Sequence, residues 1–429
     1  MAAMTTAAEE CALVPKLRFP EFRDAGEWKE KALSELGNFF RGITYSAKEV
    51  VEDGLLVLRS SNIQDGALVL HKDLVFIDKT CPNDIKLKDG DILICMSNGS
   101  KALVGKSAEY HGNYEGNLTA GAFCSIFRPS IKFSKLIFQS EKYRRFISVS
   151  IGGGNINNLK NSDLEEFKHP IPKLASEQQK IADCLASIDE LITLESQKLD
   201  TLKLHKKGLM QQLFPAEGET APRLRFPEFR DAEGWSAPML AEISKLIDER
   251  VGDRKLTPIS ISAGIGFVPQ VEKFGRDISG EQYRRYTVIR DGDFVYNKGN
   301  SIRFPQGCIY DLQGWGEAAA PNVFICFRLK EGYENGFFRQ YFEKNIHGIQ
   351  LKKYITSGAR SNGLLNISKE TFFAIRIPLP SKAEQQKIAD CLGSLDDVIA
   401  MQARKVDALK THKKGLMQQL FPRMDEVEA

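Results

Sequence analysis

Residues 177–215 read EQQKIADCLASIDELITLESQKLDTLKLHKKGLMQQLFP, and residues 384–422 repeat this stretch as EQQKIADCLGSLDDVIAMQARKVDALKTHKKGLMQQLFP. A second phrase, PKLRFPEFRDAGEW at 15–28, returns as PRLRFPEFRDAEGW at 222–235, at the same offset of 207 residues. The segments between the repeated phrases are similar in length but differ in sequence. The chain therefore consists of two tandem copies of one unit, in which a shared frame carries two different domains.

The repeated stretch has the apolar period of a long helix. Apolar residues recur in alternating steps of four and three, and this average spacing of about 3.5 residues predicts a coiled-coil seam. Ser176 and Ser381 stand where a helix N-cap is expected, and Pro215 and Pro422 end the two helices. The predicted seam consists of Ile181, Leu185, Ile188, Ile192, Leu199, Leu202, Leu209 and Leu213 in the first copy and Ile388, Leu392, Leu395, Ile399, Val406, Leu409, Leu416 and Leu420 in the second.

Four positions of the seam are polar. They are Glu195 and Lys206 in the first helix and Gln402 and Lys413 in the second. One apolar stripe of this width normally needs a partner stripe, and the chain carries a matching one. We therefore expect the two helices to pack on each other; the alternative is that each packs separately on its own domain.

The short linker between the copies favours an antiparallel pair, because a parallel pair would need a long crossover. The predicted order is a tail over 1–14, a domain over 15–172, a helix over 173–215, a linker over 216–221, a domain over 222–380, a helix over 381–422 and a tail over 423–429. The expected fold is α+β. Two homologous α/β domains are separated by an antiparallel coiled coil, with an approximate two-fold axis and a nearly circular chain path.

Composition bounds the class of protein. The chain has 429 residues, of which 42% are hydrophobic and 27% charged, as in soluble globular domains. Its net charge is only +3, so any nucleic-acid surface must be a local patch. The sequence shows neither a signal-peptide pattern nor an apolar run that reaches a membrane span, so we expect a cytoplasmic protein without membrane contact. The 8 cysteines form no Cys-x-x-Cys pair, which predicts neither a zinc site nor a redox motif.

The divergent segments show strand and helix patterns in the same order. In the first domain, strands are predicted over 55–58, 67–70, 74–77, 91–95 and 122–127, followed by a helix over 134–149. In the second, strands are predicted over 257–261, 293–296, 308–311 and 323–327, followed by a helix over 337–349. The two domains are therefore expected to share a fold but not their loops.

The whole chain resembles the specificity subunit of type I restriction-modification enzymes. The resemblance is carried by the duplicated helix, the Ile-Pro turn before it, GDILICMSNGS at 90–100, GDFVYNKGNS at 292–301 and SGARSNGLLNIS at 357–368. It implies two target-recognition domains, each reading one half of a gapped, asymmetric site in double-stranded DNA. It also implies that the helices dock a pair of methyltransferase subunits and, through them, restriction subunits. The chain itself would be non-catalytic and bind no cofactor, with S-adenosylmethionine, ATP and magnesium on the partners.

Exposed loops rich in Arg, Lys, Asn and Ser are the candidates for DNA contact, because such side chains bind base edges and phosphates. For each loop the alternative is an ordinary surface turn. The candidate residues are Arg59, Ser60, Asn62, Asn98, Lys101, Asn155 and Asn157 in the first domain and Lys298, Asn300, Arg303, Arg360 and Asn362 in the second.

The candidate motifs for catalysis and metal binding do not have the spacing that these sites require. The stretch from Gly99 to Lys106 has one residue too many for a phosphate-binding loop, and the 6 histidines show no metal spacing. We therefore predict no catalytic and no metal-ligating residue. The favoured function is DNA recognition and scaffolding, and the alternative is a two-domain coiled-coil adaptor that binds proteins and does not read DNA. A fused nuclease or methyltransferase is disfavoured, because the length leaves no room for a further domain.

Overall fold

The computed structural model describes residues 13–151, 158–262, 264–299, 304–355 and 365–422. The chain divides into two compact units: unit 1 is Met1–Leu194 with Lys405–Ala429, and unit 2 is Glu195–Arg404. Both divisions fall inside the long helices, so each unit contains part of each helix. Residues of both long helices belong to the core of each unit.

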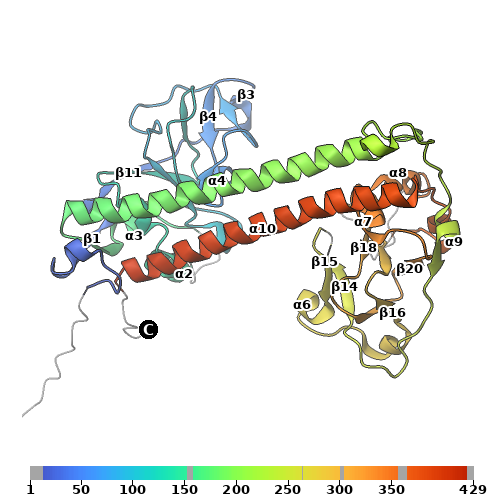
Figure 1. The fold of residues 1–429 in the computed structure, drawn as a ribbon. Helices are drawn as coiled ribbons and strands as arrows, with labels where there is room; N and C mark the ends of the chain where they lie inside the picture. Colours follow the sequence, from blue (N-terminus) through green and yellow to red (C-terminus); the bar gives the residue numbers. More distant parts are fainter. Residues whose placement is uncertain (1–12, 152–157, 263, 300–303, 356–364, 423–429) are drawn as a thin grey trace, which may run out of the picture. The chain divides into compact units, whose positions relative to one another are not determined.

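The two repeated stretches form single helices of 39 residues each, α4 (Ala175–Leu213) and α10 (Lys382–Leu420) (Figure 1). Leu, Ala, Glu, Lys and Gln dominate both stretches, and these residues have high helix propensity. All of the predicted seam positions are buried or half-buried, whereas most residues between them are exposed. The apolar period therefore marks the covered face of each helix.

Polar contacts at the seam give the direction of the helices within unit 2. Gln402 Nε2 donates to Glu195 Oε2 at 2.6 Å, and Lys206 Nζ lies 2.6 Å from Asp396 Oδ1. From Glu195 to Lys206 along α4, the partner residue on α10 changes from Gln402 to Asp396. The numbering of α10 therefore decreases as that of α4 increases. The two helices run in opposite directions within this unit.

Unit 1 contains the far end of α10 as well as the first described residues. Leu17 N donates to Gln419 O at 2.9 Å. The ring centroids of Phe421 and Trp28 are 6.0 Å apart, and both side chains are buried in the same core. Residues far apart in the sequence therefore share one core at this point.

The duplicated RFPEF phrase holds the first turn of each long helix. In unit 1, Arg18 Nε and Nη2 donate to Glu177 Oε1 and Oε2 at 2.7 and 2.8 Å. In unit 2, Arg225 makes the same pair with Glu384 at 2.8 and 2.7 Å. Both carboxylates are buried, and hydrogen bonding to them raises the pKa of each arginine. The same ion pair thus anchors the start of both helices.

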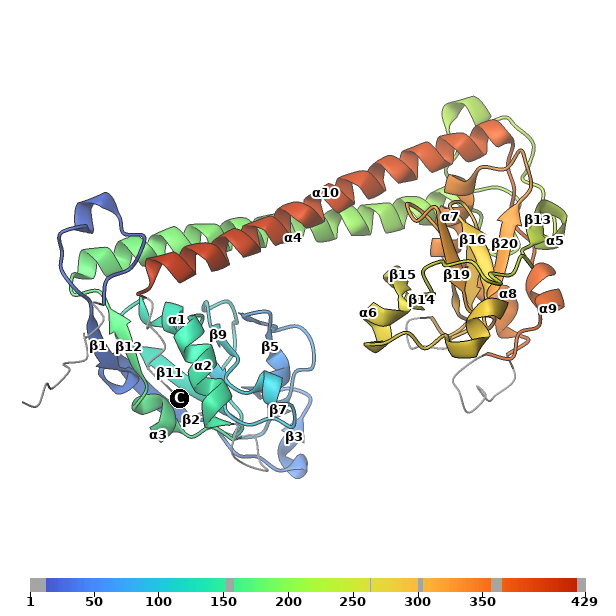
Figure 2. The ribbon, with the colours of Figure 1, turned by 90° about the horizontal axis from the view of Figure 1, so that it is seen from below.

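The strands of unit 1 are short and come mostly from the divergent segment. They are β1 (Lys29–Ala32), β2 (Gly37–Arg41), β3 (Val50–Val51), β4 (Leu55–Leu58), β5 (Ile63–Gln64), β6 (Ala67–Leu68), β7 (Phe76–Ile77), β8 (Ile92–Cys95), β9 (Ser107–Glu109), β10 (Leu118–Ala120), β11 (Cys124–Pro129) and β12 (Lys168–Ile171). Their sheet orders are β10-β4-β7-β3, β2-β11-β8-β9, β1-β12 and β5-β6. β1 and β12 lie side by side with Lys29 opposite Ile171, so the divergent segment begins and ends at neighbouring positions (Figure 2).

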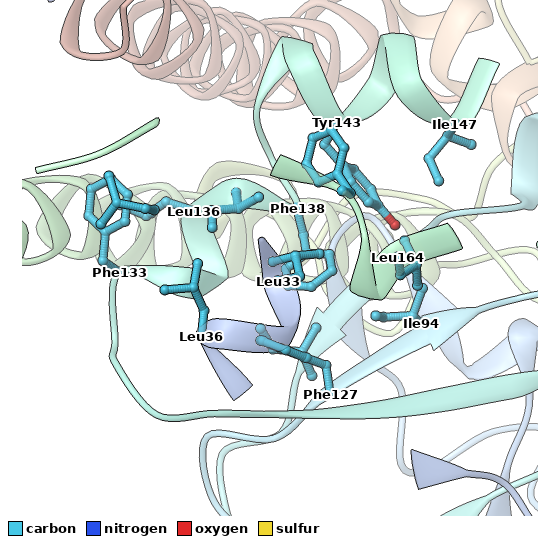
Figure 3. Packing of buried hydrophobic residues seen from close by; sticks show 14 of the residues in the cluster. Leu33, Leu36, Ile94, Phe127, Phe133, Leu136, Phe138, Tyr143, Ile147 and Leu164 are labelled. Atoms are coloured by element: carbon cyan, nitrogen blue, oxygen red, sulfur yellow. The ribbon is translucent and has the colours of Figure 1, made fainter. Parts of the chain in front are cut away.

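Three helices of unit 1 pack in one core with the β2-β11-β8-β9 sheet. They are α1 (Ser134–Ile137), α2 (Glu141–Ser150) and α3 (Asn161–Glu165). Figure 3 shows Tyr143 and Ile147 of α2 and Leu164 of α3 gathered near Ile94 of β8. Tyr143 OH donates to Gly105 O at 3.1 Å, which satisfies the buried hydroxyl.

Unit 2 repeats this framework with different lengths. Its strands are β13 (Ser244–Leu246), β14 (Ile259–Ser262), β15 (Gly266–Pro269), β16 (Thr287–Arg290), β17 (Phe294–Asn297), β18 (Cys308–Asp311), β19 (Glu317–Ala320) and β20 (Ile325–Leu329). Its helices besides the long ones are α5 (Leu240–Ile243), α6 (Gln270–Phe274), α7 (Asn335–Glu343), α8 (Ile346–Lys352) and α9 (Lys369–Phe373). The sheet orders are β13-β20-β17-β18, β14-β15 and β16-β19. The antiparallel pair β17/β20 corresponds to β8/β11 of unit 1.

Two predicted helices are interrupted, and the prediction of one continuous helix was wrong in both places. The stretch 134–149 forms α1 and α2, because Ser140 Oγ accepts from Tyr143 N at 3.2 Å and begins a new helix. The stretch 337–349 forms α7 and α8, which are separated at Asn345 with a left-handed φ of 58°. Side chains that bond to the nearby backbone compete with helix continuation, and the apolar period does not report this.

His347 of α8 makes unit 2 sensitive to acid. Its side chain is buried, its ring nitrogens have no hydrogen-bond partner among the described residues, and burial lowers its pKa from 6.5 to about 3. Because the unfolded chain binds this proton near pH 6.5 and the folded unit only near pH 3, stability falls as the pH drops through that interval. We expect a loss of about 2 kcal/mol between pH 7 and pH 5 from this group.

Hydrogen exchange of unit 2 peptides at both pH values measures this loss. The matched variant His347→Leu keeps the apolar packing and has no group to protonate, so its pH dependence should be smaller by the same amount. Equal pH dependence in the two proteins would contradict the prediction.

Candidate nucleic-acid interface

The predicted loops of unit 1 meet at the end of β8. Ser60 begins a 3-10 turn over Ser60–Asn62, and Asn98 follows β8. Asn98 Nδ2 donates to Ser60 Oγ at 3.0 Å, which joins these two loops. Ser97 pairs with Asn158, and Leu159 N donates to Met96 O at 2.8 Å. Residues 158 and 159, which follow the candidate residues Asn155 and Asn157, therefore lie beside the loops that carry Ser60 and Asn98.

Asn62 does not belong to the exposed surface, and the prediction that it contacts DNA is corrected. Its side chain is fully buried. Asn62 Oδ1 accepts from Arg59 N at 2.9 Å, and Nδ2 donates to Val69 O and Lys72 O at 3.3 and 3.2 Å. With the amide used in this way, Asn62 fixes the shape of the loop that carries Arg59 and Ser60.

The other described candidates of unit 1 differ in how accessible they are. Lys101 is exposed at the start of a 3-10 turn. Arg59 is half-buried, and its Nη2 donates to Asp73 O at 2.9 Å. Ser60 and Asn98 are half-buried and bonded to each other. Lys101 is thus suited to bind a phosphate, while the other three form a more constrained surface.

In unit 2 the residues that flank the candidate loops pair in the equivalent way. Leu365 N donates to Lys298 O at 2.9 Å, as Leu159 N does to Met96 O in unit 1. Lys298 Nζ reaches Ile367 O at 3.5 Å. The stretch after β17 therefore lies beside residues 365–367.

Six predicted DNA contacts lie outside the described residues. They are Asn155, Asn157, Asn300, Arg303, Arg360 and Asn362. The structure gives the position of their flanking residues only.

A matching ion pair fixes the strand pair under each candidate surface. In unit 1, Arg128 of β11 binds Asp91, with Nη2 2.7 Å from Oδ2. In unit 2, Arg328 of β20 binds Asp293, with Nε 2.6 Å from Oδ1. Both aspartates are buried, and both stand just before the strand that leads to the loops. The two units thus share the ion pair that holds the two strands together, and they differ in the sequences of the loops that follow.

Phe123 also lies at this surface, although loop composition does not predict it. The stretch 122–127 was predicted as one strand, but β11 starts only at Cys124, and Phe123 belongs to the preceding turn with its side chain 69% exposed. Met96 N and Ser97 N approach Phe123 O at 2.8 and 3.3 Å. Apolar alternation favours a strand here, and the turn glycine at 121 was the signal against it.

The cysteines of unit 1 near this surface are protonated thiols. Burial raises the pKa of Cys95 and raises that of Cys124 to about 12. Among the residues that the structure describes, no group of three His, Cys, Asp or Glu side chains is placed to hold a metal ion. Searched over the same residues, the helices include none with the apolar length that a bilayer span requires.

A known protein family and its members match most of this chain. The family model for the "Type I restriction modification DNA specificity domain" matches residues 25–204 and 288–411. The chain is 32% identical over 398 residues to the type I restriction enzyme StySPI specificity subunit of Salmonella potsdam, which covers 87% of this chain and 84% of that one. It is 34% identical over 199 residues to the EcoKI specificity subunit of Escherichia coli strain K12, which covers 43% of this chain and 41% of that one.

A solved structure has a similar fold. The crystal structure of a type I restriction-modification S subunit from M. genitalium aligns over 96% of this chain and 100% of that chain, with a TM-score of 0.57 and 15% sequence identity. Two matching domains in one chain, and a relative that is 32% identical over 87% of this chain, show that this protein belongs to the specificity-subunit family of type I restriction-modification systems.

Proposed function

We propose that this chain is the DNA sequence-recognition subunit of a type I restriction-modification complex and that each unit reads one half of a bipartite, gapped, asymmetric site in double-stranded DNA. One observation carries the proposal: corresponding strands and ion pairs in the two units lead into loop sequences that differ between the units. Leu159 bonds to Met96 beside the candidate loops of unit 1, as Leu365 bonds to Lys298 beside those of unit 2. Two readers with unlike surfaces require an asymmetric site.

The long helices serve in this proposal as one antiparallel coiled coil that spaces the two readers. Lys413 Nζ donates to Asp189 Oδ1 at 2.6 Å in unit 1, and Lys206 Nζ lies 2.6 Å from Asp396 Oδ1 in unit 2. The second pair repeats the first with the two copies exchanged, as expected for contacts about a two-fold axis. These repeated pairs support the proposed pseudo-two-fold arrangement, and the bond from Leu17 N to Gln419 O supports a nearly circular chain path.

The seam also contains a contact between equivalent positions. Glu195 and Gln402 occupy the same place in the repeat and are bonded at 2.6 Å. A residue meets its own equivalent only at a two-fold axis, so this pair marks where the axis of the proposed coiled coil would lie. The helix length of roughly 58 Å at about 1.5 Å per residue accommodates half-sites about 34 Å apart.

The same helices would carry the scaffolding role. Leu191 and Leu194 on α4 are 40% and 55% exposed, and their repeat equivalents Val398 and Met401 on α10 are 40% and 55% exposed. Each pair consists of two exposed apolar side chains, about one helical turn apart and outside the predicted seam. We assign these two places to a pair of methyltransferase subunits, through which restriction subunits join. In this proposal the chain is non-catalytic, and the partners hold S-adenosylmethionine, ATP and magnesium.

Salt-dependent binding to defined duplexes tests the proposed function. We expect the assembled complex to prefer one sequence and to lose affinity steeply as salt rises, because phosphate contacts release counterions. Lys101→Ala should weaken binding to all sequences alike and lower the slope of log affinity against log salt by about 1. The matched control is Lys132→Ala, an exposed lysine beyond the opposite end of β11, which should leave the slope unchanged.

Two outcomes would argue against DNA reading. Equal affinity for all duplexes would remove the recognition role. Retention of protein partners without any duplex binding would favour the adaptor function instead.

A further inference from the structure

Phe123 is a large apolar side chain at the surface of unit 1. Single exposed apolar residues are common on proteins and need no special explanation. What distinguishes Phe123 is how firmly its backbone is held and which loops it lies between. Phe123 is 69% exposed, whereas Gly121 and Cys124 of the same turn are buried.

The turn that carries Phe123 is fixed on both sides. Gly121 N donates to Leu58 O at 2.8 Å, which ties the turn to the end of β4. Cys124 N donates to Gly121 O at 2.8 Å and closes the turn. Met96 N donates to Phe123 O at 2.8 Å, which ties it to the end of β8. Three backbone hydrogen bonds therefore hold the backbone of this turn, and with it the Cα atom of Phe123, at the surface.

These anchor points place Phe123 between the two candidate loops. Leu58 directly precedes Arg59 of the first loop, and Met96 is two residues before Asn98 of the second. Asn98 bonds across to Ser60, so the loops on both sides of the turn are joined. A base that met the polar side chains of these loops would lie within reach of the ring.

Unit 2 has an exposed apolar residue at the corresponding turn. Val323 lies just before β20, as Phe123 lies just before β11, and its side chain is 43% exposed. Phe324 N donates to Pro321 O at 3.0 Å, which repeats the bond that closes the turn of unit 1. Extending the β17/β20 register places Val323 opposite Lys298, as Phe123 stands opposite Met96. Two divergent units thus present apolar side chains of different size at one position.

We propose that Phe123 is a specificity-determining residue that makes an apolar contact with a base in the half-site read by unit 1, and that Val323 does the same in unit 2. The inference rests on the proposed DNA-reading function and adds a residue that the Arg, Lys and Asn chemistry of the loops does not include. Two parts of a base offer apolar surface to such a ring. One is the thymine methyl group at the edge of the major groove, and the other is the face exposed when neighbouring bases unstack.

Selection from a pool of random-sequence duplexes tests the inference. The full chain, assembled with its methyltransferase partners, is compared as wild type, Phe123→Ala, Val323→Ala and Val50→Ala. Val50 is 46% exposed on β3, at the opposite edge of its sheet from β10, and is the matched control. Because the replaced side chains are exposed, melting temperatures should be unchanged, and Phe123→Leu should keep part of the preference.

We expect Phe123→Ala to relax the preference at one or two adjacent positions of one half-site. Affinity for the selected duplex should fall about tenfold while affinity for an unrelated duplex stays the same. Val323→Ala should relax the other half-site by about threefold, and Val50→Ala should change neither.

Two modified duplexes identify the surface that the ring contacts. Uracil in place of thymine at the relaxed position would reproduce the loss for wild type but not for Phe123→Ala if the methyl group is contacted. A rise in 2-aminopurine fluorescence with wild type but not with Phe123→Ala would instead show that the ring enters the stack.

Different results would contradict the proposed base contact of Phe123 and the proposed DNA-reading function. If wild type selects a sequence and Phe123→Ala selects the same sequence with equal affinity, the inference alone is wrong. It is also wrong if Phe123→Ala loses partner assembly with unchanged selection, because the ring would then contact a protein. If wild type selects no sequence, the proposed function fails and the inference fails with it.

Discussion

Replacing residues 29–170 with the equivalent segment of a family member that has another target changes one half of the methylated sequence and leaves the other half unaltered. The exchange is structurally feasible because Lys29 of β1 lies directly opposite Ile171 of β12, so the two junctions are neighbours in one small sheet. Unit 2 keeps its own core and its own loops, and these contain no residue of the exchanged segment.

Mapping of methylated bases, in cells that also express the proposed methyltransferase partners, measures the result of this exchange. The reciprocal exchange of residues 236–379 is the matched control and should alter only the other half. A change in both halves after a single exchange would contradict independent readers, and no change in either would place recognition outside the divergent segments.

Glu177→Ala destabilises unit 1 by about 3 kcal/mol, because it leaves a buried arginine without its counter-charge. Arg18 and Glu177 are 6% and 0% exposed as side chains, and the pair is bidentate. Trp28 Nε1 also donates to Glu177 Oε1, at 3.3 Å. Hydrogen exchange of unit 1 peptides in increasing denaturant measures the loss separately from unit 2.

The duplication supplies a matched comparison within the same chain. Glu384→Ala removes the equivalent pair with Arg225, but Trp235 Nε1 has no hydrogen-bond partner among the described residues. We therefore expect Glu384→Ala to destabilise unit 2 by about 1 kcal/mol less than Glu177→Ala destabilises unit 1. Glu21→Ala, which removes an exposed pair with Lys180 and a backbone hydrogen bond at the surface, should have a much smaller effect. Equal small effects in all three variants would show that the buried pairs do not anchor the helices.

The long helices were predictable because their evidence is local and repeated. The seam residues recur over 39 residues, and the period alone gives the covered face. The breaks near Ser140 and Asn345 were not predictable from this period, because a side-chain cap and a left-handed residue decided them. The short strand β1 also escaped prediction, since the sequence KEKA has no apolar alternation and is a strand only through its pairing with β12.

The residues of the candidate site were likewise predictable only in part. Loop composition indicated the segments around Ser60 and Asn98, and these do meet in the structure. Composition could not separate Asn62 from its neighbours, because burial of one amide depends on residues 69 and 72 across the loop. Phe123 was hidden in an apolar run that resembled a strand.

The duplication, the two long helices and the family follow from the sequence alone, because a long repeat at constant offset and a sustained apolar period need no information about distant contacts. Tertiary structure alone decided which loops converge, which amide is buried and which aromatic ring is exposed. These outcomes depend on pairs such as Met96 with Leu159 and Gly121 with Leu58, whose members lie far apart in the sequence. Only the packed chain brings such residues within hydrogen-bonding distance.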